Sequence, residues 1–136
     1  EEYMFPHVRK AITDAWRRAG VDSVVSLDGI ETHDCFTSTE YMAIDHFGLT
    51  PPGQSWQAID SGLVELDGRC PVNASGGLIG VGHPVGATGA RLLLDAGRQV
   101  TGTAGDYQVR GARTYGTLNI GGSLGTVVSF VVGLRD

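Results

Sequence analysis

The sequence has few cysteines, no long apolar run and no excess of basic residues. Two cysteines among 136 residues are too few for a disulfide scaffold and favour a reducing, cytoplasmic location. No run reaches the length of a membrane span, and the N-terminus lacks the layout of a signal peptide. The net charge of −5 argues against nucleic acid and anionic membranes as partners. Because the chain begins with Glu1, we expect a piece of a longer protein.

The remaining composition, 41% apolar and 18% charged residues, is that of one globular domain with a core. Helical and strand-like periodicities alternate, which predicts a layered α/β domain. In the predicted helix Ala87–Val100, positions 90, 93, 94 and 97 form the expected buried face. We expect helices at Pro6–Ala19, Ser38–Phe47, Trp56–Ser61 and Ala87–Val100, strands at Val24–Glu31, Tyr115–Ile120 and Thr126–Val132, and an exposed segment over 101–113.

The last two strands are joined by a glycine-containing connection typical of a hairpin. The near-continuous apolar run of Thr126–Val132 predicts a strand covered on both faces.

Glycines are concentrated in Asn73–Gly89, around a single His-Pro step. Such density requires close backbone approach or repeated positive φ, and it presents His83 in a turn before a helix. The imidazole could serve as acid/base or oxyanion donor, or it could only bond the turn. A dinucleotide loop is disfavoured because Pro84 removes an N–H donor and Gly86 comes one residue late for G-x-G-x-x-G.

A second cluster, His33-Asp34-Cys35-Phe36, lies where a strand gives way to a helix. Ligands often bind at such strand ends, and a helix N-terminus stabilises a thiolate. Cys35 could therefore act as acid/base or nucleophile, or it could be a small buried hydrophobe. We expect it to share a pocket with His83. Metal binding by histidines and cysteines is disfavoured because no ligand spacing is recognisable.

The third cluster, Asn119-Ile120-Gly121-Gly122, follows a strand. Its backbone N–H groups could stabilise an oxyanion, although Gly-Gly at a hairpin is usually only a turn.

Together these residues resemble the C-terminal half of a thiolase. The resemblance rests on Asn-Ala-Ser-Gly-Gly from Asn73, Gly-His-Pro-Val-Gly-Ala-Thr-Gly from Gly82, and the glycine-rich terminal hairpin. His33-Asp34-Cys35-Phe36, in place of Asn-Glu-Ala-Phe, resembles the sterol-carrier-protein type of thiolase. The resemblance implies a layered mixed β-sheet with helices on both faces, and residues 1–136 as the C-terminal domain without its first strand and helix.

The resemblance also implies a function: acyl transfer by Claisen condensation or thiolytic cleavage of a 3-ketoacyl-CoA, in fatty acid or sterol side-chain degradation. His83 would activate the nucleophilic cysteine and form an oxyanion hole with His33. Cys35 would move the α-proton, and the N–H of Gly121 would stabilise a tetrahedral oxyanion. Substrate contacts would come from Asn73, Gly82 and Pro84. Coenzyme A would be substrate, with no tightly bound cofactor, and the enzyme would be a homo-oligomer.

Two departures from the family pattern stand out. Asn119 replaces a cysteine found in many thiolases, which fits a transfer of its role to Cys35. The nucleophilic cysteine lies in the N-terminal half, which this sequence lacks, and Cys70 does not match its motif. We therefore expect the chain to be inactive without an N-terminal partner half. A thiolase-fold acyl-CoA lyase (a retro-aldolase) and a non-catalytic thiolase-like subunit remain as alternatives.

Overall fold

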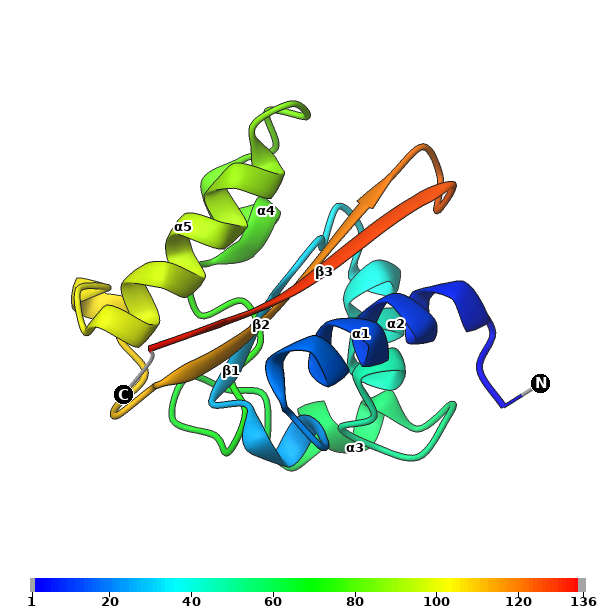
Figure 1. Cartoon of the computed structure of the whole chain (residues 1–136), viewed down its shortest axis with the longest axis horizontal. Helices are drawn as coiled ribbons and strands as arrows, with labels where there is room; N and C mark the ends of the chain where they lie inside the picture. Colours follow the sequence, from blue (N-terminus) through cyan, green and yellow to red (C-terminus); the bar gives the residue numbers. More distant parts are fainter. Residues whose placement is uncertain (1, 135–136) are drawn as a thin grey trace.

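A computed structural model describes residues 2–134, which fold around a three-stranded mixed sheet (Figure 1). Strand β1 (Gly29–Thr32) runs parallel to β2 (Thr114–Gly121), and β2 pairs antiparallel with β3 (Thr126–Gly133). The β2–β3 pairing confirms the predicted hairpin. On the other side of β1, Ile30 forms a parallel bridge to Val72. The expected mixed sheet with helices on both faces is confirmed.

One face of the sheet is covered by α1 (Pro6–Ala19) and α2 (Thr37–Phe47), close to the predicted ranges. Helix α1 begins at Pro6, whose missing N–H costs nothing there, and ends at Gly20 in the left-handed region, with φ of 70°. Its buried stripe packs with apolar residues of α2, β1 and β2. The members of this core include Val8, Ile12, Trp16, Ile30, Phe47 and Leu118.

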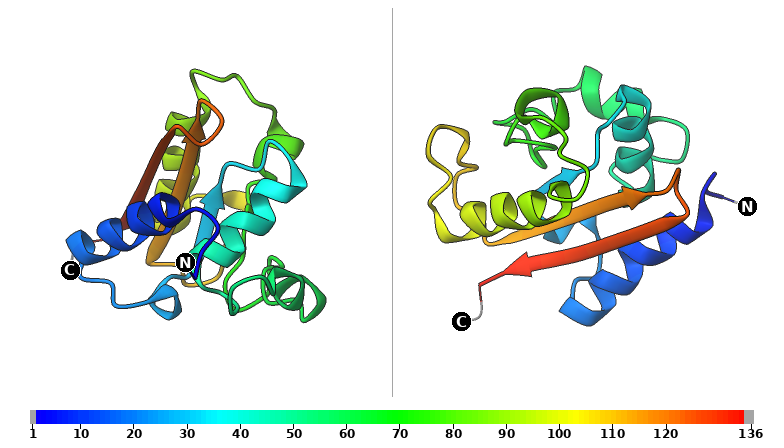
Figure 2. Two further views of the ribbon diagram at one scale, coloured as in Figure 1. Left: turned by 90° about the vertical axis from the view of Figure 1, so that its right-hand side faces the viewer. Right: turned by 90° about the horizontal axis from the view of Figure 1, so that it is seen from above.

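The opposite face is covered by α5 (Thr88–Thr101), as two views of the fold show (Figure 2). Ala96 and Val100 of this helix pack with Tyr115 of β2. The remaining elements are short: α3 (Ser55–Asp60), α4 (Gly77–Val81) and the 3-10 turns η1 (Val24–Ser26) and η2 (Gly105–Tyr107). The predicted helix over Trp56–Ser61 corresponds to α3, whereas α4 was not predicted because glycine is a poor helix former.

The predicted strand Val24–Glu31 was wrong in its first half. Residues 24–26 form η1, and pairing begins at Gly29. The Asp28 carboxylate accepts the backbone N–H groups of Arg113 and Thr114, at 2.8 and 2.9 Å, which fixes where the strand starts. A side chain at Gly29 would collide with the ring of Tyr115, so this glycine is required by the packing of the sheet.

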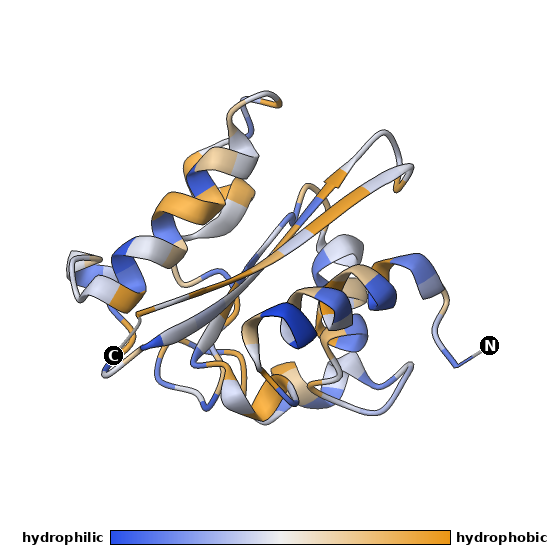
Figure 3. Cartoon of the chain, viewed as in Figure 1, coloured by the Kyte–Doolittle hydropathy of each residue, from blue (hydrophilic) through white to orange (hydrophobic). Residues whose placement is uncertain are grey.

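The predicted buried face of α5 was also wrong. The residues that face the sheet include Leu92, Ala96 and Val100, whereas Ala90 and Leu94 are exposed. The run Leu92-Leu93-Leu94 places apolar side chains on more than one side of the helix, so spacing alone could not choose the face. Figure 3 shows this apolar character along α5 and β3.

The prediction that the last strand is covered on both faces was wrong as well. Its exposure alternates, and Val128 and Phe130 remain 41% and 45% exposed. The expectation of an exposed segment over 101–113 fails at Ala104, Val109 and Ala112, which are buried.

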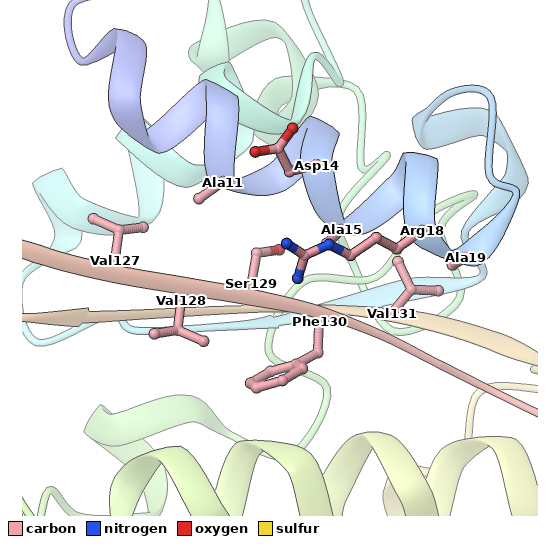
Figure 4. A pocket seen from close by; sticks show the side chains of 10 residues that line it. All are labelled: Ala11, Asp14, Ala15, Arg18, Ala19, Val127, Val128, Ser129, Phe130 and Val131. Atoms are coloured by element: carbon pink, nitrogen blue, oxygen red, sulfur yellow. The ribbon is translucent and has the colours of Figure 1, made fainter.

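A groove of about 440 Å³ lies between α1 and β3 (Figure 4). Val127, Ser129 and Val131 point toward α1, whereas Val128 and Phe130 point to the other face. The α1 wall consists mainly of small side chains: Ala11, Ala15 and Ala19. Among residues 2–134, no strand pairs with the outer edge of β3. No helix in this part of the chain is long and apolar enough to cross a membrane.

Candidate active site

A small cavity of about 230 Å³ opens near the ends of β1 and β2. It brings together residues from the three sequence clusters, although these are far apart in the chain. Its lining comprises His33, His83, Val85, Thr88, Asn119, Ile120, Gly121, Gly122 and Ser123. The juxtaposition of His33, His83 and Gly121 agrees with the expected oxyanion-hole set, whose roles stay predictions.

His33 forms the buried wall of this cavity. Its backbone N–H donates to the carbonyl of Leu118 at 3.0 Å, which continues the β1–β2 ladder past the end of β1. Its ring is 7% exposed and meets the His83 ring edge to face, with centroids 4.7 Å apart. Burial, with a smaller contribution from His83, lowers the pKa of His33. Burial therefore favours the neutral form of this imidazole, and its buried Nδ1 has no hydrogen-bond partner.

His83 is held by Thr88, in the first turn of α5. The two side chains are joined by a 2.7 Å bond between His83 Nδ1 and Thr88 Oγ1. The Thr88 hydroxyl also lies 3.3 Å from the Pro84 carbonyl, to which it can only donate, so both contacts are satisfied together when His83 Nδ1 carries the hydrogen. That tautomer leaves Nε2 with a free lone pair, as a general base requires. The sequence did not single out Thr88, whose signal is its position five residues after the histidine.

Asp34 ties the first cluster to the glycine-rich segment. Its Oδ1 accepts the Leu78 N–H at 2.7 Å and caps α4, the helix just before His83. A side chain on Gly77, where φ is +59°, would collide with the Asp34 carboxylate. Glycine is thus required at 77 for both its conformation and its lack of a Cβ. The sequence places Asp34 within the His-Asp-Cys-Phe motif but does not indicate this capping role.

A second buried carboxylate, Glu31, fastens the same segment further upstream. Its two oxygens accept the Ser75 hydroxyl at 2.6 Å and the Ser75 N–H at 3.1 Å. Burial, only partly offset by these bonds, raises the pKa of Glu31 to about 7. This pair was not predicted, because an acidic residue at an inward-facing strand position interrupts the apolar pattern by which a buried strand is recognised.

Asn73 makes two hydrogen bonds within the domain. Its Oδ1 accepts the Thr32 N–H at 2.8 Å, and its Nδ2 donates to Glu40 at 3.3 Å. Its side chain is thus engaged in holding β1 and α2, and its predicted substrate contact stays a prediction. Gly82, with φ of 96°, and Pro84 are both exposed around His83, where a substrate could reach them.

Cys35 is half-buried, and its Sγ lies 3.9 Å from Thr39 Oγ1 of α2. It is not among the residues that line the cavity, although it follows His33 by two positions. The cavity beside His83 is thus lined by His33, and the pocket shared by Cys35 and His83 stays a prediction. No group of three or more His, Cys, Asp or Glu side chains within residues 2–134 could hold a metal ion.

A family model for the thiolase C-terminal domain-like group matches residues 1–134. The chain belongs to this thiolase family. It is 42% identical over 100 residues to an acetyl-CoA acetyltransferase of Methanothermobacter thermautotrophicus, covering 74% of this chain and 26% of that protein. It is 38% identical over 113 residues to sterol carrier protein 2 of Gallus gallus, covering 83% and 20%. The chain therefore spans about a quarter or less of the length of these thiolase-like relatives.

A solved structure of an "Ltp2-ChsH2(DUF35) aldolase" superposes with a TM-score of 0.83, covering 94% of this chain and 32% of that one. At 21% identity this likeness shows the fold alone. The resemblance to the C-terminal half of a thiolase, and the fold it implied, are confirmed.

Proposed function

We propose that the chain supplies the C-terminal half of an acyl-CoA acyltransferase, a thiolase that makes or cleaves the carbon–carbon bond of a 3-ketoacyl-CoA. The observation that carries this proposal is the edge-to-face pair of His33 and His83, which shares one cavity with the Gly121 turn. Claisen chemistry develops negative charge on a thioester oxygen, and preorganised donors at that oxygen lower the barrier.

The residues would divide the work as follows. His83 Nε2 would take the proton of the nucleophilic cysteine and, once protonated, donate to the oxygen of the thioester enolate together with His33. The Cys35 thiolate would take the α-proton, and the electron pair of the broken C–H bond would pass to the thioester oxygen as the enolate forms. The Gly121 N–H would bind the alkoxide of the tetrahedral intermediate. Coenzyme A enters as part of the substrate, with no resident cofactor.

We further propose that an N-terminal thiolase half covers the exposed apolar face of this domain and brings the nucleophilic cysteine. Leu94 of α5, Phe130 of β3 and Val85 beside His83 are 53%, 45% and 81% exposed. The free edge of β3, bordered by the α1 groove, would receive a further strand, which we propose to come from a part of the protein that precedes residue 1. The assembled enzyme would be a cytoplasmic homo-oligomer acting in lipid breakdown.

The test uses the protein in which this chain is joined to its N-terminal half. His83→Ala is expected to lower the rate of 3-ketoacyl-CoA thiolysis by about 10²- to 10⁴-fold. Arg110→Ala, at an exposed position away from the cavity, serves as the matched control. Retro-aldol cleavage of a 3-hydroxyacyl-CoA without thiolysis would replace the proposal with the lyase. Absence of both reactions would favour a non-catalytic subunit.

A further inference from the structure

A second cavity, of about 480 Å³, lies between the N-terminal segment, α2 and the tip of the β2–β3 hairpin. Its size is within the range of small-molecule sites. Its walls are mainly apolar and include both methionines of the chain: Met4, Phe5, Tyr41, Met42 and Leu124. Methionine side chains are flexible and adapt to ligands of different shape.

Four of the polar side chains that line this cavity, Thr39, Asp45, His46 and Ser55, are already bonded within the protein. The bonds join Thr39 Oγ1 to the Phe36 carbonyl at 2.6 Å, Asp45 Oδ1 to the Gly53 N–H at 2.6 Å, Ser55 Oγ to the Tyr41 carbonyl at 2.7 Å, and the two His46 nitrogens to the Met42 carbonyl and the Phe5 N–H at 2.8 and 3.1 Å. A polypeptide segment would bring backbone N–H and carbonyl groups that need partners here. A hydrocarbon chain brings none, so the chemistry of the walls favours it.

The cavity adjoins the candidate active site on two sides. Gly121, Gly122 and Ser123 line the catalytic cavity, and the next residue, Leu124, lines this one. On the α2 side, Thr39 lines the cavity and its Oγ1 lies 3.9 Å from Cys35 Sγ. A substrate whose reacting carbons lie near Cys35 and His33 therefore has an apolar space beside them.

We propose that this cavity binds the apolar acyl chain of the thioester substrate, so that the enzyme prefers long acyl chains to acetyl-sized ones. The proposal rests on the proposed acyl-CoA function, which it deepens by naming the substrate class. Met42 and Met4 are the specificity-determining contacts.

The two methionines allow a direct binding test on the 136-residue chain. With ¹³C-methyl methionine the spectrum contains two methyl signals, both from this cavity, and Met42→Leu assigns them. S-decanoyl-N-acetylcysteamine is expected to shift both signals, and S-acetyl-N-acetylcysteamine to shift neither. Unmoved signals at saturating decanoyl probe, or equal shifts with the acetyl probe, would overturn the proposal.

A cavity-filling variant provides the second measurement. Met42→Trp is expected to abolish the decanoyl-induced shift of Met4, whereas the matched control Val25→Trp, at an exposed position in η1, preserves it. If Met42→Trp does not fold, Met4→Trp is the alternative, because the Met4 side chain is 80% exposed. In that variant the decanoyl-induced shift is measured on the methyl signal of Met42. If adding the N-terminal half shifts both signals and prevents the decanoyl response, a protein segment occupies the cavity and the proposal fails.

Kinetics separate this proposal from the function on which it rests. In the protein with both halves, Met42→Trp is expected to lower kcat/KM for 3-oxodecanoyl-CoA by about tenfold or more and to leave acetoacetyl-CoA within about twofold. Equal losses for both substrates would overturn the acyl-chain proposal alone. If the decanoyl probe shifts the methyl signals but the protein with both halves shows no thiolysis activity, the proposed thiolase function is overturned and the proposed binding site is retained.

Discussion

The contact between Gly77 and Asp34 gives a prediction that can be worked out in energy. Gly77→Ala adds a Cβ at a residue with φ of +59°, against the Asp34 carboxylate. A left-handed conformation costs a residue with a side chain about 1–2 kcal/mol. If the carboxylate moves away, its bond to the Leu78 N–H is lost, at about 1.5–3 kcal/mol for a charged acceptor. The expected loss of stability is therefore about 3 kcal/mol or more.

Urea denaturation of the chain, followed by circular dichroism, measures this loss. At slopes of about 1–3 kcal/mol per M, the midpoint falls by about 1–3 M. Gly97→Ala is the matched control, because Gly97 is helical and a Cβ there meets nothing within 4 Å. It is expected to raise stability by about 0.5–1 kcal/mol. A Gly77→Ala protein as stable as the Gly97→Ala protein would refute the reasoning.

A double-mutant cycle identifies the cause of the loss. In an Asp34→Ala background the carboxylate is absent, so Gly77→Ala should cost only the backbone share of about 1–2 kcal/mol. If the stability losses of the two single substitutions simply add in the double variant, the Asp34 carboxylate is not what excludes a side chain at position 77.

Three further predictions concern the site, the pH response and the assembly. In the protein with both halves, Cys35→Ser should slow exchange of α-deuterium from acetyl-CoA severely while acyl transfer to the nucleophile stays measurable, because a hydroxyl is a weaker acid than a thiol; unchanged exchange would assign the proton step to another residue. Folding raises the pKa of Glu31 to about 7. The contribution of its protonated form to the free energy of unfolding is therefore fully present below about pH 4.5 and is lost as the pH rises toward 7. Between pH 4.5 and 7 the unmodified chain should lose about 3 kcal/mol of unfolding free energy, and the Glu31→Gln chain should not, as denaturation midpoints would show. Parallel pH curves for the two proteins would contradict this. Light scattering after size exclusion should show the 136-residue chain self-associated through the α5 and β3 face, since each 100 Å² of wet apolar surface forfeits about 2.5 kcal/mol; a monomer with a cooperative melt would argue for an independent domain.

The sequence predicted those parts of the fold in which local signals agree. Pro6 and Gly20 mark both ends of α1, and the glycine turn of the hairpin lies where the spacing of β-rich runs placed it. The family motifs also identified His33, His83 and Gly121, which one cavity brings together.

What could not be predicted depends on contacts between distant residues. Asp34 and Leu78, like Glu31 and Ser75, are 44 positions apart in the sequence. No local pattern around either acidic residue indicates which distant residue it bonds. The strand boundary at Gly29 is set by the ring of Tyr115 and by the Asp28 carboxylate, both matters of tertiary packing. The exposed side of α5 and the uncovered β3 have the composition of buried elements. Spacing therefore predicted coverage that these elements lack within residues 2–134, where Leu94, Val128 and Phe130 are exposed.

The open edge of β3 has a consequence for the handling of this chain. Thr126–Gly133 reads Thr-Val-Val-Ser-Phe-Val-Val-Gly, with strong β-propensity, no charge and no proline. Segments of this kind, presented at an unpaired edge, are templates for intermolecular strand addition and amyloid-like stacking. Synthesis of this chain by itself therefore risks inclusion bodies at high concentration. A single gatekeeper charge at the exposed position 128 would protect the edge, and low temperature or co-expression with the proposed N-terminal half would do so without changing the sequence.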